Sequence, residues 1–540
     1  MFFDLSRGKL VMLFIIIILF LASIGFFLYL NGSWALIARI EENMSMTRSQ
    51  IWFWLLYKLS PESAARSAAN NNLNISNVAR SIPALLYHGE GAGTDMPTAV
   101  FVDQMQALKQ AGWHTTTMQE FDAWEKGIRE LPDKSFLLTF DDGRKDTYYQ
   151  ADPVLKDVGF HAIMFVITGF SLPNSGKNPN FYLNRTELAD MIKSGRWELE
   201  SHGKEDHGLY AVQSTTDLEH SASSTPGHYL SNKFWSVSAH RFETDAEFTA
   251  RVQGDMRASK EALESEFGRS VIAFAFPFND FGQSSINFDG ARAIIDRITP
   301  RIYTYAFYQT WPGNGAFNYP HMGSTPGSTS FMIRRFEPKP QWSGQDLLDI
   351  LNAGRARNVP YRSSQLGNEW SGTWGNIAYE SGAIALSGNS QTTGASVFLN
   401  GSAWWSDYLF TALLDWQRGE TLSLLARVDN QNYISCAFSG TRVIIAWHND
   451  GASQETITAK EYQFQGSPHD AHLGIGVALN RVTCYEEGTA VVSGVSRYMT
   501  RNGGIGVEVW DKTPGIAKSV LKSVDIQLLR GVQMQATSTP

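Results

Sequence analysis

Phe136-Leu137-Leu138-Thr139-Phe140-Asp141-Asp142-Gly143 is the stretch that decides the fold of this 540-residue chain. A continuous apolar run that ends in two carboxylates and a glycine is typical of a buried parallel strand followed by a polar turn. In αβ barrels and open sheets, functional residues lie at the carboxyl ends of such strands. One carboxylate can bind a metal while its neighbour accepts a proton, although an Asp-Asp-Gly turn alone is common on protein surfaces.

Helical and strand-like segments alternate around this stretch, from Ser81 to about Pro360. The pattern predicts strands at 82–87, 162–167 and 271–276 and a helix at 101–111. The capping box Thr244-Asp245-Ala246-Glu247 predicts the start of a longer helix, which ends at Gly268. Buried strands that alternate with helices predict an α/β fold with a parallel sheet or barrel.

Two histidines, His202 and His207, follow a further predicted strand that begins at Trp197. A spacing of five does not place two side chains on one helix face, so the pair must converge through a loop containing Gly203. Together with Asp142 they make a His-His-Asp set with open positions, which suits a catalytic metal. The alternative is two unrelated surface histidines.

Five segments of residues 81–360 occur in an order and spacing that resembles the polysaccharide deacetylase family of metal-dependent carbohydrate esterases. The segments are Leu85-Leu86-Tyr87-His88, Leu138 to Gly143, the strand from Ala162, Trp197 to His207, and Phe274-Ala275-Phe276-Pro277-Phe278. The resemblance implies a distorted (β/α) barrel. It also implies that this barrel acts on a polysaccharide substrate.

The resemblance also implies a role for each matching residue. Asp141 would be the general base, and the backbone N–H of Phe278 would bind the oxyanion. His321 is the candidate general acid, whereas His88 either lines the site or is a buried structural histidine. The metal ligands would be Asp142, His202 and His207. Zinc suits this set best, and cobalt or nickel would fit too.

The chain departs from the family pattern beside Pro277. Ala275 stands where many members carry an arginine that orients the catalytic aspartate, so Arg334 or Arg335 on a later strand is expected to replace it. Phe278 replaces the usual tyrosine, and Asn279 replaces the usual glycine. Residues 209–241 are longer than the barrel needs, and they form either a wall of the sugar cleft or a lid packed on the barrel.

Leu10 to Leu30 carries no charged residue, and as a helix it would be about 32 Å long, enough to span a membrane. A cleaved signal peptide is the alternative, but its apolar core is usually only about 7–15 residues long. Because Arg7 and Lys9 precede the span, we expect a cytoplasmic N-terminus and an exported remainder. This predicts a single-pass cell-membrane protein with a tail at 1–9, a transmembrane anchor at 10–30, and a stalk and linker at 31–80.

From about Ser364 to residue 530, short alternating segments predict an all-β sandwich. Residues 425–433 and 503–507 give it a resemblance to jelly-roll sandwiches related to laminin-G and legume lectins. Seven tryptophans either stack on sugars or fill the core, so carbohydrate binding stays open: Trp370, Trp374, Trp404, Trp405, Trp416, Trp447 and Trp510. Cys436 and Cys484 form one disulfide or remain two buried thiols.

Composition excludes some classes of function. With 45 basic and 53 acidic residues the net charge is −8, which makes sequence-independent nucleic-acid binding a poor candidate. Three hypotheses remain. The first is an anchored, exported enzyme that hydrolyses N-acetyl groups of a hexosamine polymer; the second is an esterase for O-acetylated glycans. The third, suggested by Ala275 and Phe278, is an inactive barrel in a cell-surface glycan-binding protein.

Overall fold

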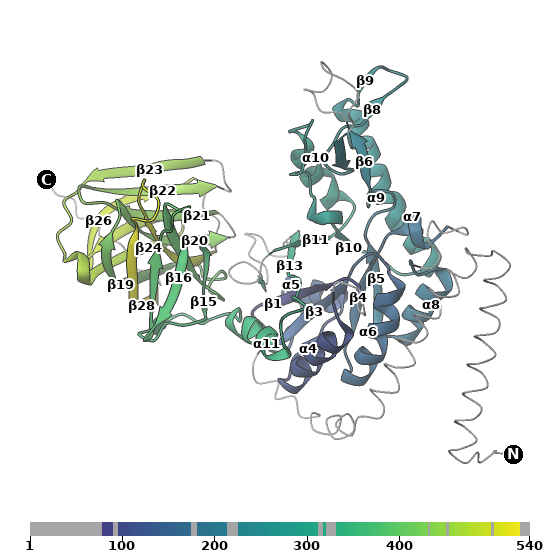
Figure 1. The fold of residues 1–540 in the computed structure, drawn as a ribbon, viewed down its shortest axis with the longest axis horizontal. Coiled ribbons are helices and arrows are strands. Elements are labelled where there is room, and N and C mark those ends of the chain that lie inside the picture. The colour runs from purple at the N-terminus through teal and green to yellow at the C-terminus, as the bar shows by residue number, and fades with distance from the viewer. Residues whose placement is uncertain are drawn as a thin grey trace, which may run out of the picture.

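The computed structural model describes residues 78–89, 96–173, 181–212, 225–310, 317–319, 331–429, 432–449, 453–497 and 502–529. These residues form a barrel domain and, to one side of it, a β-sandwich (Figure 1). The predicted transmembrane segment 10–30 lies outside the described residues, as does nearly all of the stalk and linker. Within the described ranges, no helix combines the length and apolar character needed to cross a membrane.

The barrel domain is built on one curved sheet whose neighbouring strands are mostly parallel. Along its main path the strands, in spatial order, are β12 (Phe317–Asn318), β1 (Ile82–Tyr87), β3 (Ser135–Phe140), β4 (Ala162–Val166), β5 (Trp197–Ser201), β10 (Ala273–Ala275), β11 (Tyr305–Gln309) and β13 (Met332–Arg335). The short strand β2 (His114–Thr115) pairs with β3 beside this path. Just after β13, the N–H of Phe336 donates to the carbonyl of Ala84 (3.1 Å), and the N–H of Leu86 donates to the carbonyl of Phe336 (2.9 Å). The first and last parallel strands therefore meet, and the sheet is a nearly closed barrel, as predicted.

Helices pack around this sheet, most of them on its outside (Figure 1). They are α4 (Thr98–Gln110), α5 (Met118–Glu125), α6 (Lys145–Val158), α7 (Thr168–Ser171), α8 (Arg185–Ser194), α9 (Asp245–Phe267), α10 (Ala291–Ile298) and α11 (Gly344–Ala353). The predicted capping box is present on α9: Thr244 and Glu247 exchange side-chain to backbone bonds, and Gly268 ends the helix at φ 61°. The buried face of α9 includes Phe248, Val252 and Met256.

Strand β3 shows why the decisive stretch is apolar throughout. All six of its residues are buried. Leu137 belongs to the apolar cluster inside the barrel, with Ile163, Ala275 and Phe307, whereas Leu138 packs in the layer between the sheet and its helices. Because side chains alternate along a strand, Asp141 continues the row of Leu137 and Thr139. The strand therefore delivers Asp141 to the mouth of the barrel.

The C-terminal region is all-β, as predicted, and consists of two antiparallel sheets that enclose one apolar core. The first contains β14 (Tyr361–Ser363), β16 (Asn376–Glu380), β17 (Ala383–Ser387), β28 (Lys518–Leu528), β19 (Tyr408–Arg418), β24 (Ala471–Ala478), β25 (Arg481–Glu486) and β26 (Thr489–Val495). The second contains β15 (Trp370–Trp374), β18 (Gly394–Leu399), β27 (Gly504–Trp510), β20 (Thr421–Asp429), β21 (Asn432–Phe438), β22 (Arg442–Asn449) and β23 (Ser453–Glu461). Strand β14 begins just before residue 364, where the sequence placed the start of this region.

A disulfide decides between the two alternatives for the cysteines. Cys436 on β21 and Cys484 on β25 are bonded, and their Cα atoms are 5.7 Å apart. Since β21 and β25 belong to different sheets, the bond crosses the sandwich core. Trp370 and Trp405 are buried in that core, so these two tryptophans have no face free for a sugar.

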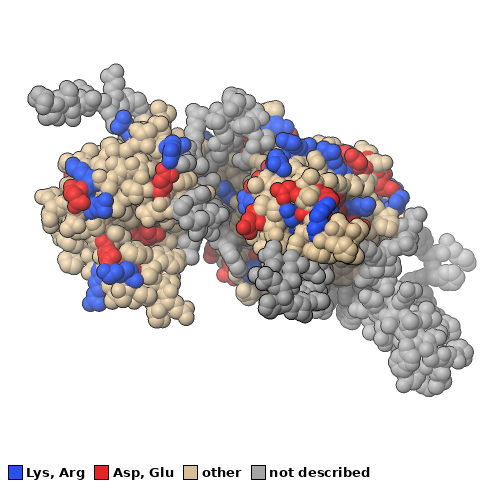
Figure 2. Space-filling view, turned by 90° about the horizontal axis from the view of Figure 1, so that it is seen from above, with Lys and Arg blue, Asp and Glu red and all other residues tan. Residues whose placement is uncertain are grey.

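The insertion between β5 and α9 forms two small hairpins near α9 and α10 (Figure 1). One pairs β6 (Leu209–Val212) with β7 (Thr225–His228), and the other pairs β8 (Trp235–Ser236) with β9 (Arg241–Phe242). On the face of the molecule in Figure 2, acidic and basic side chains are interspersed over the barrel domain. This mixture fits the small net charge of the sequence.

Candidate active site

Asp141 is held by an arginine from the far end of the domain. Arg335 Nη1 donates to Oδ1 of Asp141 (2.7 Å) and Nη2 donates to Oδ2 (2.6 Å), and both side chains are buried. Burial alone would raise the pKa of Asp141, but the charge of Arg335, with His202 and the Arg335 hydrogen bonds, lowers it. Of the two arginines expected to replace the missing family arginine, the structure therefore selects Arg335.

Asp142 and the two histidines come together as the sequence predicts. Nε2 of His207 is 3.1 Å from Oδ1 of Asp142, and Nε2 of His202 is 3.5 Å from the same oxygen. Nδ1 of His202 lies 2.8 Å from the carbonyl oxygen of Ala275, so Nδ1 carries the proton and Nε2 offers a lone pair. The backbone of Asp142 is left-handed, with φ 73°, a strained conformation of the kind found at functional sites.

These three residues fit a divalent metal ion. One ligand atom from each lies within 4.8 Å of the others. Oδ1 of Asp142 is buried and faces the Nε2 atoms of both histidines, so a cation placed among the three side chains would bind all of them. Two imidazole nitrogens and a carboxylate oxygen are a common ligand set for zinc.

The loop that brings His202 and His207 together is fixed from two sides. Gly203 has φ 77°, and its Cα lies against the carboxylate of Asp206, where a Cβ would collide. The carboxylate of Asp255 on α9 accepts the backbone N–H groups of Lys204 (3.0 Å) and Glu205 (2.8 Å). Burial, reinforced by nearby Asp255, raises the pKa of Asp206 well above its usual value.

His88, which the sequence left between two roles, lies in the same cavity as Asp141. Its Nδ1 is 2.9 Å from Oε1 of Glu337. Burial acts to lower the pKa of His88, but the hydrogen bond to Glu337 and the charges of Asp141 and Asp142 raise it. Sequence reasoning missed Glu337; the available signal was strand alternation, which places Glu337 on the same side as Arg335.

Phe278 follows Pro277 in a left-handed conformation with φ 56°, and Asn279 has φ 55°. The Asn279 side chain fixes this turn: its Oδ1 accepts from the N–H of Gln309 (2.6 Å) and its Nδ2 donates to the Gln309 carbonyl (3.1 Å). Asparagine tolerates a left-handed backbone better than most residues. This explains how Asn279 can stand where the family usually has glycine.

Most of the predicted site residues line one cavity of about 210 Å³. Its lining comprises Leu86, His88, Asp141, Asp142, His202, His207, Phe276, Phe278, Asn279, Gln309 and Arg335. His321 lies outside the described residues, so its role as general acid stays a prediction. The cavity has room for an acetyl group and joins a buried carboxylate, three imidazoles and a candidate metal site.

Comparison with known proteins places the barrel in a functional class. Residues 128–289 match the family model for polysaccharide deacetylases. The chain is 32% identical over 123 residues to YxkH of Bacillus subtilis (strain 168). This match covers 22% of this chain and 42% of that protein. The chain is also 32% identical over 109 residues to the poly-beta-1,6-N-acetyl-D-glucosamine N-deacetylase of Staphylococcus aureus (strain MRSA252), covering 20% of this chain and 37% of that protein.

Among solved structures, a de-N-acetylase from Aggregatibacter actinomycetemcomitans matches with 16% sequence identity and a TM-score of 0.40. That match covers 50% of this chain and 99% of the solved chain. The present chain spans less than half the length of each of the two curated relatives named above. It contains a polysaccharide deacetylase domain.

Proposed function

We propose that this polysaccharide deacetylase domain hydrolyses N-acetyl groups on a hexosamine polymer, with a metal ion, and releases acetate and free amines. The observation that carries the proposal is a single cavity that combines the Arg335-held Asp141 with the ligand set Asp142, His202 and His207. The named Staphylococcus aureus relative supports an N-acetylglucosamine polymer as the substrate class. An O-acetylated glycan is the alternative, because the same residues would serve ester hydrolysis.

Asp142, His202 and His207 would hold the ion, with zinc the best fit to these donors and cobalt or nickel acceptable. When bound there, a divalent ion lowers the pKa of a water molecule and polarises the acetyl carbonyl. The lone pair of His202 Nε2 is kept available because Nδ1 faces the Ala275 carbonyl.

Asp141 acts as the general base in this proposal. Its carboxylate accepts a proton from the attacking water while the water oxygen bonds to the acetyl carbon. The low pKa of Asp141 keeps it ionised across the neutral range. The two hydrogen bonds from Arg335 fix the orientation of the carboxylate during that transfer. The backbone N–H of Phe278 is the proposed donor to the oxyanion.

His88 is the proposed general acid. When the C–N bond breaks, the departing nitrogen needs a proton, and the imidazolium of His88 can donate one from Nε2. Glu337 favours the protonated form of the His88 ring. In turn, the hydrogen bond from His88 holds the pKa of Glu337 at about 2, although burial acts to raise that pKa. We place His88 before His321 in this role because His88 lines the cavity.

Location and the second domain remain proposals as well. We propose a membrane anchor at residues 10–30 and a barrel outside the cytoplasm. The disulfide between Cys436 and Cys484 supports export, because disulfides persist in oxidising compartments. We also propose that the sandwich binds carbohydrate, for which partly exposed Trp416 and Trp447 are candidates.

The test is acetate release from β-1,6-linked N-acetylglucosamine oligomers, peptidoglycan and acetylated xylan, with and without a chelator. Chelator-sensitive release from the oligomers supports the proposal, whereas release from xylan alone favours the esterase alternative. Asp141→Asn should abolish turnover while the protein still binds metal in full stoichiometry. A protein that binds no metal and releases no acetate would favour the third hypothesis, an inactive glycan-binding barrel.

A further inference from the structure

Three aromatic rings form a row that leads out of the candidate active site. The ring of Phe278 lies between His207, with centroids 4.6 Å apart, and His228, with centroids 4.9 Å apart. His207 is a candidate metal ligand, whereas His228 comes from the inserted hairpin of β6 and β7. We call His207, Phe278 and His228 the ring row. It connects the metal site directly to the insertion.

The outer end of the ring row is open to solvent and partly apolar. Phe278 is 46% exposed, and the His228 side chain is 27% exposed. Leu209, which pairs with His228 across the hairpin, is 58% exposed. Exposed apolar side chains beside a catalytic cavity are typical of a surface that binds a ligand. Pyranose rings present apolar faces that pack on such surfaces.

His228 also faces a buried carboxylate. Its Nδ1 is 3.2 Å from Oδ2 of Asp280, which is buried. Asp280 also accepts hydrogen bonds from the hydroxyl of Ser231 and from the N–H of Gly282. Because Nδ1 faces this carboxylate, Nδ1 carries the proton of the neutral ring and Nε2 offers a lone pair. Nε2 of His228 can then accept a hydrogen bond from a hydroxyl group of a ligand.

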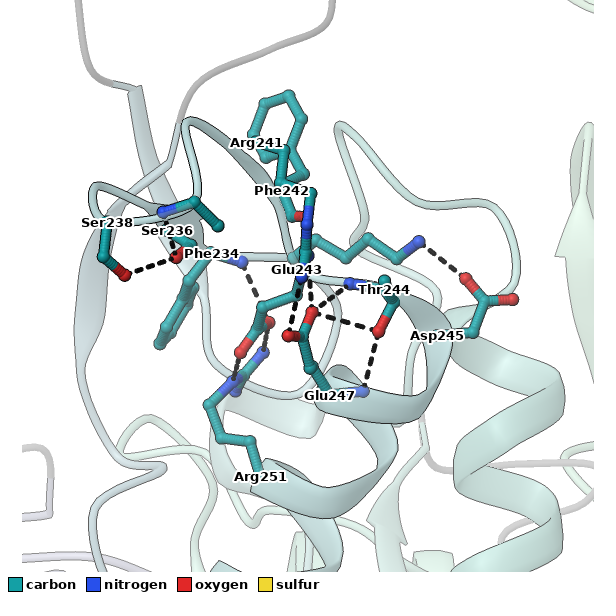
Figure 3. A network of polar contacts seen from close by, with 12 residues as sticks. Phe234, Ser236, Ser238, Arg241, Phe242, Glu243, Thr244, Asp245, Glu247 and Arg251 are labelled. Carbon is teal, nitrogen blue, oxygen red and sulfur yellow. Dashed lines mark hydrogen bonds and ion pairs between the residues drawn. The ribbon is translucent and has the colours of Figure 1, made fainter.

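The segment that carries His228 is anchored to the barrel. Arg251 on α9 donates to the carbonyl oxygens of Tyr229 (2.9 Å) and Asn232 (2.8 Å). Figure 3 shows Arg251 paired with Glu243 near Phe234, and its guanidinium carbon lies 3.9 Å from the centroid of the Phe234 ring. These contacts hold the segment in place next to the cavity. The insertion therefore lies beside Phe278 at the edge of the cavity, while its described residues do not line the cavity itself.

We propose that Leu209, His228 and Phe278 form a subsite for the sugar next to the one that is deacetylated. The apolar face of this neighbouring sugar packs on Leu209 and Phe278. Nε2 of His228 accepts a hydrogen bond from one of its hydroxyl groups. This inference rests on the proposed function and names the part of the chain that would make the enzyme prefer a polymer to a single sugar.

The test separates the subsite from the chemistry by measuring binding without the metal. A β-1,6-linked N-acetylglucosamine pentamer is titrated into the chelator-treated full-length protein, and the Kd is measured by calorimetry. His228→Ala should weaken the Kd about tenfold, since it removes a hydrogen bond and a packed ring. His228→Phe keeps the ring and should weaken the Kd by roughly fivefold.

His469→Ala is the matched control, because His469 pairs with Asp415 (2.8 Å) in the same way but on the sandwich. With metal restored, the ratio of kcat/KM for the pentamer to that for 4-nitrophenyl acetate should fall about tenfold in His228→Ala. An unchanged Kd and ratio in both His228 variants would overturn the subsite, as would a wild-type protein that does not bind the pentamer. Binding that depends on His228 without acetate release would uphold the subsite and refute the proposed function.

Discussion

Arg335 is the residue on which the base depends most directly, because it makes both hydrogen bonds to the Asp141 carboxylate. We expect Arg335→Met to lower kcat/KM by about 10²–10⁴-fold, the contribution of a well-placed general base. The charge of Arg335 also lowers the pKa of Asp141, so its removal should move the acidic limb of the pH–rate profile to higher pH. Both effects are measured in one series of kcat/KM values against pH.

Arg334 provides the matched control for this prediction. It is the neighbouring residue on β13, and its Nε is 3.3 Å from the hydroxyl of Tyr308, not from Asp141. Arg334→Met should leave the acidic limb where it is in wild type. Equal shifts in the two variants would show that the loss of positive charge, rather than the bidentate contact, explains the result.

The burial of His161 predicts that the stability of the barrel depends on pH. Burial lowers its pKa to about 4, whereas the unfolded chain has a value of about 6.5. Between these values the unfolded state binds more protons, so stability falls as the pH drops from 6.5 to 4. The loss is on the order of 3 kcal/mol at most.

His161→Gln should remove this part of the pH dependence, because glutamine does not titrate. The measurement is the melting temperature of the barrel between pH 4 and pH 7.5 by calorimetry. Parallel curves for the variant and the wild type would contradict the assignment of a neutral, buried His161.

The loop between His202 and His207 is the element that brings the candidate metal ligands together, and Gly203 is its critical position. A side chain at 203 would have to adopt φ 77° and would collide with Asp206. We expect Gly203→Ala to weaken zinc binding by roughly 10–100-fold, as when the groups supporting metal ligands are lost. Competition with a chromogenic chelator measures the Kd.

Gly195→Ala separates the two effects of alanine at position 203, which are backbone strain and collision with Asp206. Gly195 ends α8 with φ 72°, but a Cβ there would meet no atom within 4 Å. This variant should lose some thermal stability from backbone strain and keep its zinc affinity. If both alanine variants bind zinc as wild type does, contact with Asp206 does not position the loop.

Elements of the site differ in how far the sequence predicts them. Asp141, Asp142, His202 and His207 follow strands directly, so a local pattern identifies them and the structure brings them together. The choice of Arg335 over Arg334 depends on which face of β13 meets the barrel interior, and that is known only once the sheet closes. Strand alternation places Glu337 on the side of Arg335, but its partner His88 lies far away in the sequence, as Asp280 does for His228, so neither contact carries a local signal.

At the scale of the whole molecule, the disulfide should stabilise one domain and not the other. Cys436 and Cys484 are separated by 48 residues and link the two sheets of the sandwich. A loop of this length corresponds to about 4 kcal/mol of stabilisation in the chain-entropy estimate. Reduction, or the double change Cys436→Val and Cys484→Val, should lower the melting transition of the sandwich.

The barrel transition should be unchanged in the same calorimetric scan, since both cysteines lie in the sandwich. A single transition that moves as a whole would instead show that the two domains unfold together. Zinc added to the scan gives an internal marker, because a ligand that binds only the folded barrel raises the melting temperature of that domain alone.

The position of Arg335 also has a consequence for biosynthesis. The candidate metal ligands lie between residues 142 and 207, whereas the partner of the proposed base arrives on β13, the last strand of the barrel. During vectorial synthesis, a nascent chain therefore carries every candidate ligand long before it carries Arg335. The base is oriented only after β13 has joined β1 and the barrel has closed. A chain that stops before β13 thus lacks the group that orients Asp141, so the proposed reaction has to wait for the complete domain.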